Sequence, residues 1–261
     1  MFFLAIGMWS LGTRSAHAGA WTREPGSFEV ISTVSYHSGY VEFDDSGVRN
    51  DLVDFSKFES VFFIEYGILE NWSAMARLVL QQVSVARGAM VDEAQGLGAT
   101  ELSLKRNLGQ FKDWVFAAQG RISIPGDAEN RLDLRLGEGN LEWEVRGLVG
   151  HSFALGNTRG FVDLQLARQF RIQPNADEWH LDMTIGYRPT ATIMTMAQVF
   201  VLRGDEVQTL AARTLASTKV QGSLVWFFKP HHGIQLYAAK MIDGRNTIAD
   251  RTIGIGYWFD F

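Results

Sequence analysis

Thr252-Ile253-Gly254-Ile255-Gly256-Tyr257-Trp258-Phe259-Asp260-Phe261 ends the chain, and every second side chain in this stretch is large and apolar. Successive side chains of an extended strand point to opposite faces. One face therefore carries Ile253, Ile255, Tyr257, Phe259 and Phe261, and the other carries Thr252, Gly254, Gly256, Trp258 and Asp260. Such alternation over about ten residues is typical of a strand that crosses a membrane within a closed β-barrel.

The composition excludes several other classes of protein. The chain has 261 residues, a net charge of -5, 26 Gly and 5 Pro. Its Lys and Arg residues are scattered rather than clustered, so we expect no nucleic-acid partner. Beyond the first residues, no apolar run reaches the roughly 18 residues that a membrane-spanning helix requires. Since there is no Cys, the sequence offers neither a disulfide nor a thiolate metal ligand.

The first 18 residues predict a signal peptide. Phe2 to Leu11 is a short apolar run, and Ala16-His17-Ala18 places small residues at the two positions that a signal peptidase requires. The run is shorter than the roughly 20 residues needed to span a bilayer. We therefore expect cleavage after Ala18, with residues 19-261 forming a single transmembrane β-barrel domain.

About twelve segments of the mature chain alternate in the same way, with turn-rich stretches between them. In the clearest segment, Trp179 and Tyr187 stand at the two ends of one apolar stripe. Eight residues at about 3.3 Å each, tilted by about 40°, cover roughly 20 Å, which suits aromatic girdles at the two membrane interfaces. The sequence therefore predicts an all-β, antiparallel up-and-down barrel of about twelve strands, with ten or fourteen as alternatives.

Four places depart from simple alternation. Arg168 falls on the apolar face, which indicates either a bulge or a position at the rim of the barrel. The segment Thr190 to Leu202 is apolar on both faces. The segment Gly233 to Met241 loses its alternation after Ala238, and Trp72 to Val85 is expected to slip in register near Gln81-Gln82.

Short and long connections alternate along the chain. Tight turns are expected at Glu70-Asn71, Gly109-Gln110, Pro189 and Pro230-His231, with longer links between them. Because the short turns of such barrels are periplasmic, both termini should be periplasmic and the number of strands should be even. His151 to Arg159 is an exception, since it forms a long link on the short-turn side.

Two stretches resemble known families. Gly256, Tyr257, Phe259 and Phe261 resemble the C-terminal assembly signal of bacterial outer-membrane proteins, although Gly254 stands where a polar residue is usual. More weakly, Ala20 to Gly26, Phe58-Glu59 and Glu65-Tyr66-Gly67 resemble outer-membrane proteins labelled as belonging to a meta-pathway of phenol degradation. The first resemblance implies a bacterial outer-membrane location, and the second implies a transporter-like barrel.

The face opposite the apolar stripes carries charges of both signs. A twelve-stranded barrel has a backbone radius of roughly 12 Å, so inward side chains leave at best a narrow opening. We expect the lumen to be lined by Lys57, Glu59, Glu65, Arg77, Arg121, Glu142, Glu144, Arg146, Asp182 and Arg188. Of these, Arg121, Arg146 and Arg188 are the candidates to face a solute. If opposite charges occupy opposite walls, they orient solutes in a water-filled constriction; if they pair directly, they form a salt-bridge lattice that closes the barrel.

Catalytic and metal-binding interpretations have less support. His37-Ser38 and His151-Ser152 are adjacent pairs whose side chains point to opposite faces of a strand, so neither predicts a nucleophile with its base. Glu142 and Glu144 share a face, about 7 Å apart, but Arg146 follows on that face and favours a salt-bridge ladder. His231-His232 lies in a turn with no third ligand close in sequence. We expect no catalytic residue, no metal and no cofactor.

These observations together predict an outer-membrane channel for passive passage of small solutes through a narrow, charge-lined lumen. Two alternatives remain: a closed structural barrel without conductance, and an outer-membrane lipid-modifying enzyme. The expected partners are outer-membrane lipid and lipopolysaccharide, a small solute, and the barrel-assembly machinery and periplasmic chaperones during biogenesis.

Overall fold

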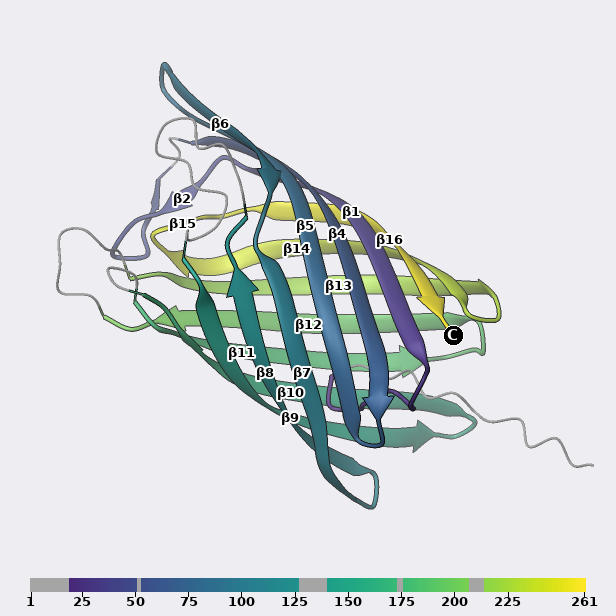
Figure 1. Cartoon of the computed structure of the whole chain (residues 1–261). Coiled ribbons are helices and arrows are strands. Elements are labelled where there is room, and N and C mark those ends of the chain that lie inside the picture. The colour runs from purple at the N-terminus through teal and green to yellow at the C-terminus, as the bar shows by residue number, and fades with distance from the viewer. Residues whose placement is uncertain (1–18, 51–52, 127–139, 173–175, 207–213) are drawn as a thin grey trace, which may run out of the picture.

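A computed structural model of the chain describes residues 19–50, 53–126, 140–172, 176–206 and 214–261. Among these residues, twelve antiparallel strands close into a barrel (Figure 1), as the sequence predicted. The barrel strands are β1 (Phe28–Gly39), β4 (Asp54–Leu69), β5 (Trp72–Arg87), β7 (Thr100–Phe111), β8 (Trp114–Ile124), β9 (Glu142–Leu155), β10 (Thr158–Phe170), β11 (Glu178–Arg188), β12 (Ile193–Gly204), β13 (Ala216–Lys229), β14 (His232–Arg245) and β16 (Arg251–Asp260). The expected signal peptide lies outside the described residues. No helix in the described part of the chain is long and apolar enough to cross a membrane.

The first and last strands close the barrel side by side. β1 pairs with β16 along its length and with β4 on its other edge. Phe28 and Phe261 exchange two backbone hydrogen bonds of 2.8 and 2.9 Å, and their ring centroids lie 5.5 Å apart. The terminal phenylalanine is therefore part of the seam.

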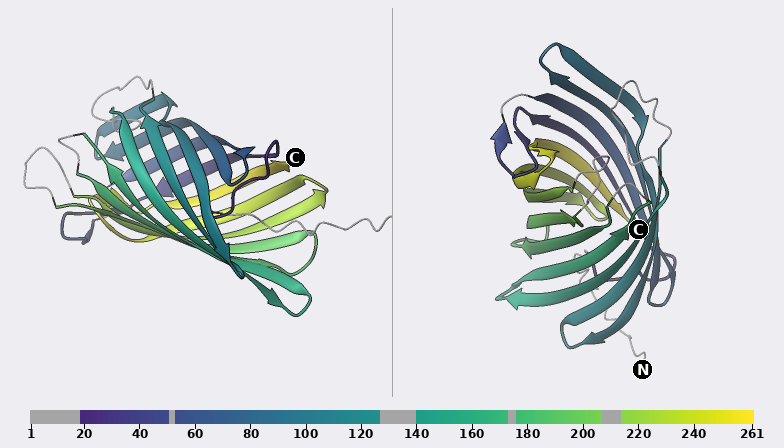
Figure 2. Two further views of the ribbon diagram at one scale, coloured as in Figure 1. Left: turned by 60° about the horizontal axis from the view of Figure 1, so that its bottom comes forward. Right: turned by 90° about the vertical axis from the view of Figure 1, so that its left-hand side faces the viewer.

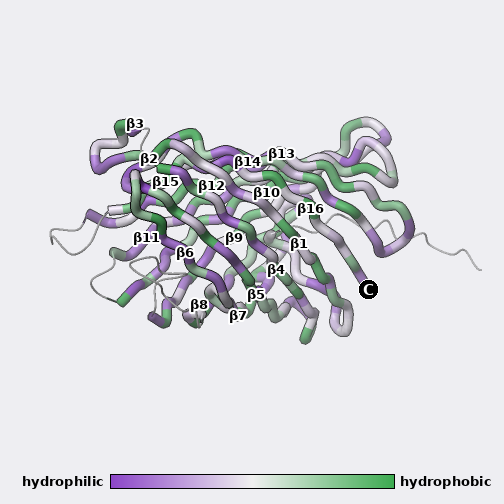
Figure 3. The backbone as a smooth tube through the Cα atoms, turned by 90° about the horizontal axis from the view of Figure 1, so that it is seen from above, coloured by the Kyte–Doolittle hydropathy of each residue, from purple (hydrophilic) through white to green (hydrophobic). Residues whose placement is uncertain are grey.

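The outer face is apolar and the inner face is polar. Figure 3 shows the alternation of hydrophobic and hydrophilic residues along the strands. Outward aromatic side chains such as Trp143, Trp179 and Trp226 are about half exposed, at 55%, 47% and 51%. Such exposure requires an apolar surrounding, because monomeric proteins in water rarely show a continuous apolar belt.

The irregular segments resolve as follows. β10 keeps an unbroken register with both neighbours, so there is no bulge at Arg168. Of the two expected explanations, a position at the rim is therefore the correct one. The expected slip in β5 is wrong, since the β4–β5 register runs unbroken through Gln81 and Gln82. There the inward Val83 and Val85 are buried in an apolar cluster with Val53 and Ala94, and the inward Val79 is buried as well. β14 continues past Ala238 to Arg245, but its register against β13 shifts between Met241 and Asp243, where the lost alternation was expected.

Three expected connections need correction. The exception at His151 to Arg159 disappears, because β9 and β10 extend into this stretch and meet at a tight turn where Gly156 has a φ of 60°. The β7–β8 turn falls at Lys112-Asp113, three residues after the expected position. Arg87 to Gly98 contains a further strand, β6 (Met90–Leu97), which pairs with the outer half of β5 and projects beyond the barrel (Figure 2).

A small sheet lies among the long connections. It consists of β2 (Glu42–Phe43), β3 (Arg49–Asn50) and β15 (Thr247–Ile248), in the order β15-β2-β3. The tight turns and Phe261 lie at the opposite end of the barrel. Because short turns are periplasmic in such barrels, we call that end periplasmic and the end with the small sheet extracellular.

Candidate functional site

One wall of the lumen carries a continuous network of ion pairs. Arg121 contacts Glu101 at 3.2 Å and Glu144 at 2.5 Å. Glu144 also pairs with Arg146 at 2.9 Å, and Arg146 reaches across to Asp182. Arg77 joins at Glu101, 3.1 Å away. Opposite charges therefore pair directly on this wall, as in the salt-bridge lattice that the sequence offered as one alternative.

The strand registers explain why these side chains meet. Arg121 of β8 stands directly opposite Glu144 of β9, and Gln169 of β10 stands opposite Glu144 on the other side. Cross-strand neighbours on one face have Cβ atoms about 5 Å apart, within reach of an arginine. Glu144 and Arg146 lie two residues apart on one strand and so share the inner face.

The remaining predicted lumen residues have other direct partners, although Gln169 links Glu142 to Arg121 through hydrogen bonds of 2.6 and 3.0 Å. Glu142 pairs with Arg171 at 2.9 Å, not with Arg146. Lys57 pairs with Glu59 at 2.6 Å, and Glu65 with Lys105 at 2.9 Å. Arg188 does not join Arg121 and Arg146, because it lies near the periplasmic end with its guanidinium 4.6 Å from the ring centre of Phe227.

Residues 19–27, the described residues before β1, occupy the periplasmic end of the lumen, which the sequence did not predict. The amide of Ala20 donates to Asp163 at 2.9 Å, and the ammonium of Lys105 donates to the carbonyl of Gly19 at 2.8 Å. Arg23 pairs with Glu29 at 2.5 Å and with Asp260 at 2.6 Å. We call residues 19–27 the internal segment. Its contacts reach β1, β7, β10 and β16, so it lies inside the barrel and not beside it.

An apolar cluster surrounds this segment. Phe161, Met194, Met196 and Val225 are buried, with Trp21, Phe227 and Trp258 packed against them. Ala20 packs in a second cluster with Val115, Ala117 and Leu148. The inner face of β12 is apolar at Met194 and Met196 because it covers Trp21, which explains why the segment from Thr190 is apolar on both faces. Trp258 points inward, as predicted, and donates to Gln235 at 2.9 Å.

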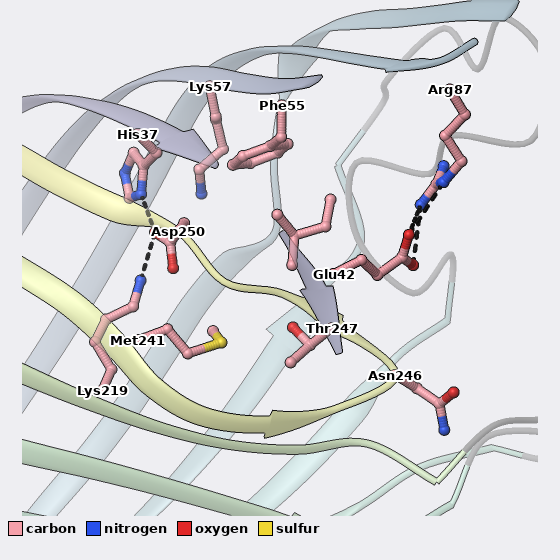
Figure 4. A pocket seen from close by; sticks show the side chains of 11 residues that line it. His37, Glu42, Phe55, Lys57, Arg87, Lys219, Met241, Asn246, Thr247 and Asp250 are labelled. Atoms are coloured by element: carbon pink, nitrogen blue, oxygen red, sulfur yellow. Dashed lines mark hydrogen bonds and ion pairs between the residues drawn. The ribbon is translucent and has the colours of Figure 1, made fainter. Parts of the chain in front are cut away.

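The described part of the lumen contains cavities, of which two border the charged side chains. A cavity of about 240 Å³ lies in the middle, bordered by Gly19 and by Arg77, Glu101, Arg121 and Arg146 of the ion-pair wall. A larger one of about 500 Å³ lies at the extracellular end, where His37, Phe55, Lys57, Lys219 and Asp250 surround it (Figure 4). We call these the central and the extracellular cavity.

A chain of polar side chains borders the extracellular cavity. His37 contacts Ser35 at 3.1 Å through Nε2 and Asp250 at 3.0 Å through Nδ1. Asp250 also accepts from Lys219 at 2.8 Å and from Thr252 at 3.0 Å. Burial alone would raise the pKa of the Asp250 carboxyl, but the hydrogen bond from His37 and the charge of Lys219 hold it below its usual range.

The position of these polar side chains argues against a catalytic role. Ser35, His37 and Asp250 are connected in the order of a hydrolase triad. Ser35, however, lies within a β1 that is paired on both edges. Its neighbouring backbone amides therefore belong to the ladder and do not form an oxyanion hole. The sequence analysis correctly placed His37 and Ser38 on opposite faces of the strand. It overlooked Ser35, which lies two residues before His37 and therefore on the same face.

A signal for the internal segment was present in the sequence. Val115, Leu148, Phe161, Met194 and Val225 are apolar residues at inward positions near the periplasmic ends of their strands. A water-filled lumen would be polar there, so these positions indicate that protein fills that end. Among the described residues, no group of three or more His, Cys, Asp or Glu side chains is placed to hold a metal ion.

Comparisons with known proteins agree with the geometry. No family model matches the chain, and no curated protein matches it. The structure is similar to that of an outer membrane channel from Pseudomonas putida F1, at 13% identity, with a TM-score of 0.73 over 93% of this chain and 98% of that chain. The NanC porin matches with 8% identity and a TM-score of 0.53, over 87% of this chain and 100% of that chain.

A further similar structure is a translocator domain. The translocator domain of the autotransporter NalP from Neisseria meningitidis is 12% identical, with a TM-score of 0.51 over 92% of this chain and 90% of that chain. Identities this low establish the fold alone. This chain has the fold of a bacterial outer-membrane β-barrel.

Proposed function

We propose that the chain is a channel that passes small solutes across the outer membrane, and that the internal segment must move for the channel to open. The observation that carries this proposal is a charge-lined lumen with two cavities, ended on the periplasmic side by a short stretch of chain and not by the barrel wall. The similar outer membrane channel from Pseudomonas putida F1 supports it.

The contacts of the internal segment suit a movable element. Residues 19–27 precede β1 and are held by individual hydrogen bonds, such as Arg23 to Ser73 at 2.8 Å, and by two ion pairs of Arg23. A β-strand of the wall is held by a full ladder on each edge. The segment can therefore leave the lumen without breaking the barrel.

A closed structural barrel is the competing proposal, and one observation favours it. The internal segment and the cluster of Phe161, Met194 and Val225 fill the periplasmic end. The two proposals differ only in whether the segment leaves the lumen.

Conductance in planar bilayers tests the choice. Because the chain has no Cys, Ala20→Cys with Ala117→Cys joins the segment to β8, within one buried cluster. We expect discrete current steps from the wild type, loss of those steps when the disulfide forms, and recovery on reduction. Ala117→Cys alone is the matched control. Absence of steps in the wild type and in a variant lacking residues 19–25 would overturn the channel in favour of the closed barrel.

A catalytic role is not part of the proposal. The Ser35 to Asp250 chain lacks an oxyanion hole, and Lys219 and Thr252 share the acid that would orient the histidine. We expect no ester hydrolysis by the purified protein. The polar chain instead holds Asp250 in place at the edge of the extracellular cavity.

Biogenesis forms the last part of the proposal. Phe261 contributes to the β1–β16 seam, and a terminal aromatic at a strand edge is what an assembly machine could recognise. We propose that the barrel-assembly machinery and periplasmic chaperones handle the chain, and that lipid and lipopolysaccharide contact its outer belt.

A further inference from the structure

The extracellular cavity has a polar side and an apolar side. Lys57 of β4 and Lys219 of β13 reach it from the barrel wall, as Figure 4 shows. Phe55, Met241 and Ile248 also line it. Its volume of about 500 Å³ falls within the range of roughly 300–1,000 Å³ typical of small-molecule sites.

The polar side presents positive charge. Lys219 pairs with Asp250 at 2.8 Å, and its side chain is 26% exposed while that of Asp250 is 8% exposed. Lys57 pairs with Glu59 at 2.6 Å, with exposures of 22% and 15%. In both pairs the ammonium is the more accessible partner. An ammonium has three N–H donors, and among the described residues each lysine gives one to a carboxylate.

The acidic groups around the cavity are already engaged. Asp250 accepts hydrogen bonds from His37, Lys219 and Thr252. Glu42 holds Arg87 through both of its oxygens, at 3.1 and 3.2 Å. A cationic ligand would have to displace one of these partners, whereas an anionic ligand can use the remaining donors of the two lysines.

The apolar side is backed by the protein interior. Phe55 and Ile248 pack against a buried cluster of Val53, Val83, Val85 and Ala94. This wall therefore offers fixed hydrocarbon surface next to the two ammonium groups. Burial of apolar area there favours binding of a ligand with a hydrocarbon body.

We propose that the extracellular cavity binds a small organic carboxylate with an apolar body about the size of one ring. Lys57 and Lys219 hold the carboxylate, and Phe55, Met241 and Ile248 contact the body. The site deepens the proposed channel function, because it names the class of solute that enters the lumen first.

Calorimetric titration of the full chain in detergent with benzoate tests the proposal. Benzamide and benzylamine, which have the same ring but neutral or positive head groups, are the matched probes. We expect benzoate to bind more tightly than either. Lys57→Met and Lys219→Met should each weaken benzoate about fivefold, the effect of one partly exposed ion pair. Lys240→Met is the control, because Lys240 is exposed on β14 next to the inward Met241.

The outcomes separate this proposal from the channel itself. Equal binding of the three probes, or unchanged benzoate affinity in both lysine variants, overturns the carboxylate site. A folded barrel migrates differently on a gel before and after heating, and each variant must keep this shift to be counted as folded. Because Lys57 and Lys219 lie on different strands, their variants are two independent tests. Current steps without benzoate binding would reject the carboxylate site and leave the channel proposal standing. Benzoate binding without current steps would reject the channel and leave the carboxylate site standing.

Discussion

Gly150 and Trp21 compete for the same space: a Cβ atom added to Gly150 would lie 2.5 Å from Cη2 of the Trp21 indole. Gly150 is on β9, and Trp21 belongs to the internal segment. The absence of a side chain at one wall position thus makes room for the largest side chain of the segment. This contact joins the wall of the barrel to the element that fills its lumen.

Gly150→Ala should therefore loosen the internal segment. A contact below 3.0 Å forces the indole or the strand to move, and Trp21 belongs to a short segment and packs edge-to-face against Phe161, with ring centroids 6.2 Å apart. We expect a higher open probability in planar bilayers than for the wild type. Gly147→Ala on the same strand is the control, because nothing lies within 4 Å of a Cβ atom there. Equal gating of the two variants would show that Trp21 does not limit opening.

Deletion of Phe261 should impair assembly more than conductance. The deletion removes two backbone hydrogen bonds to Phe28 and a ring contact at the seam, while the lumen keeps its ion pairs. We expect a several-fold smaller heat-modifiable folded fraction on gels and an unchanged single-channel current from the protein that does insert. Phe228→Ala, an exposed aromatic on β13, should leave the folded fraction near the wild-type value. A changed current with normal assembly would contradict this prediction.

Glu144→Gln should shift ion selectivity and lower stability. Glu144 is buried between Arg121 and Arg146, and removing one partner of a buried ion pair costs about 3–5 kcal/mol. The reversal potential in a KCl gradient should move toward anion preference, because two guanidinium groups next to the central cavity lose their shared carboxylate. Glu93→Gln, exposed on β6, should change neither quantity. An unchanged reversal potential would mean that ions do not pass this wall.

Arg168→Ala should cost about 1 kcal/mol of unfolding free energy, as expected for a rim ion pair. Arg168 contacts Asp205 at 2.5 Å and Asp177 at 3.2 Å. Its hydrogen bond and charge hold the pKa of Asp205 below the usual value. A lowered pKa stabilises the fold above the unfolded pKa and loses that effect as pH falls through the folded pKa. In urea titrations the difference from wild type should be full above about pH 4 and shrink in stronger acid. A difference that grows in acid would contradict the pairing.

The strand pattern could be predicted because it needs only local information. Tyr257 and Phe259 alternate with Gly256 and Trp258, and the side-chain period of an extended strand is two. The errors occurred where this period is overridden by packing. In β5 the inward valines looked like a slip in register, but they cover an apolar cluster instead. The β9–β10 connection was expected to be long, but the strands extend to Leu155 and Thr158, and Gly156, with a φ of 60°, permits a tight turn between them.

The lumen was predicted as a list of residues and not as an arrangement. Alternation placed Arg121, Glu144 and Arg146 inward, but the pairing of Arg121 with Glu144 depends on the β8–β9 register. Alternation also placed Arg188 inward, although its distance along the barrel axis separates it from the other two arginines. Asp250 and His37 are 213 residues apart in the chain and meet only because the barrel closes between β1 and β16.

By itself the sequence determined a barrel of about twelve strands with an apolar outside and a charged inside, since both properties follow from the period of a strand and the solvent on each face. The structure decided between ten, twelve and fourteen strands. Only the tertiary structure decided what occupies the lumen. The internal segment, the partners of each charge and the extracellular cavity depend on contacts between distant strands, and these contacts are set by register and closure, which no local pattern encodes.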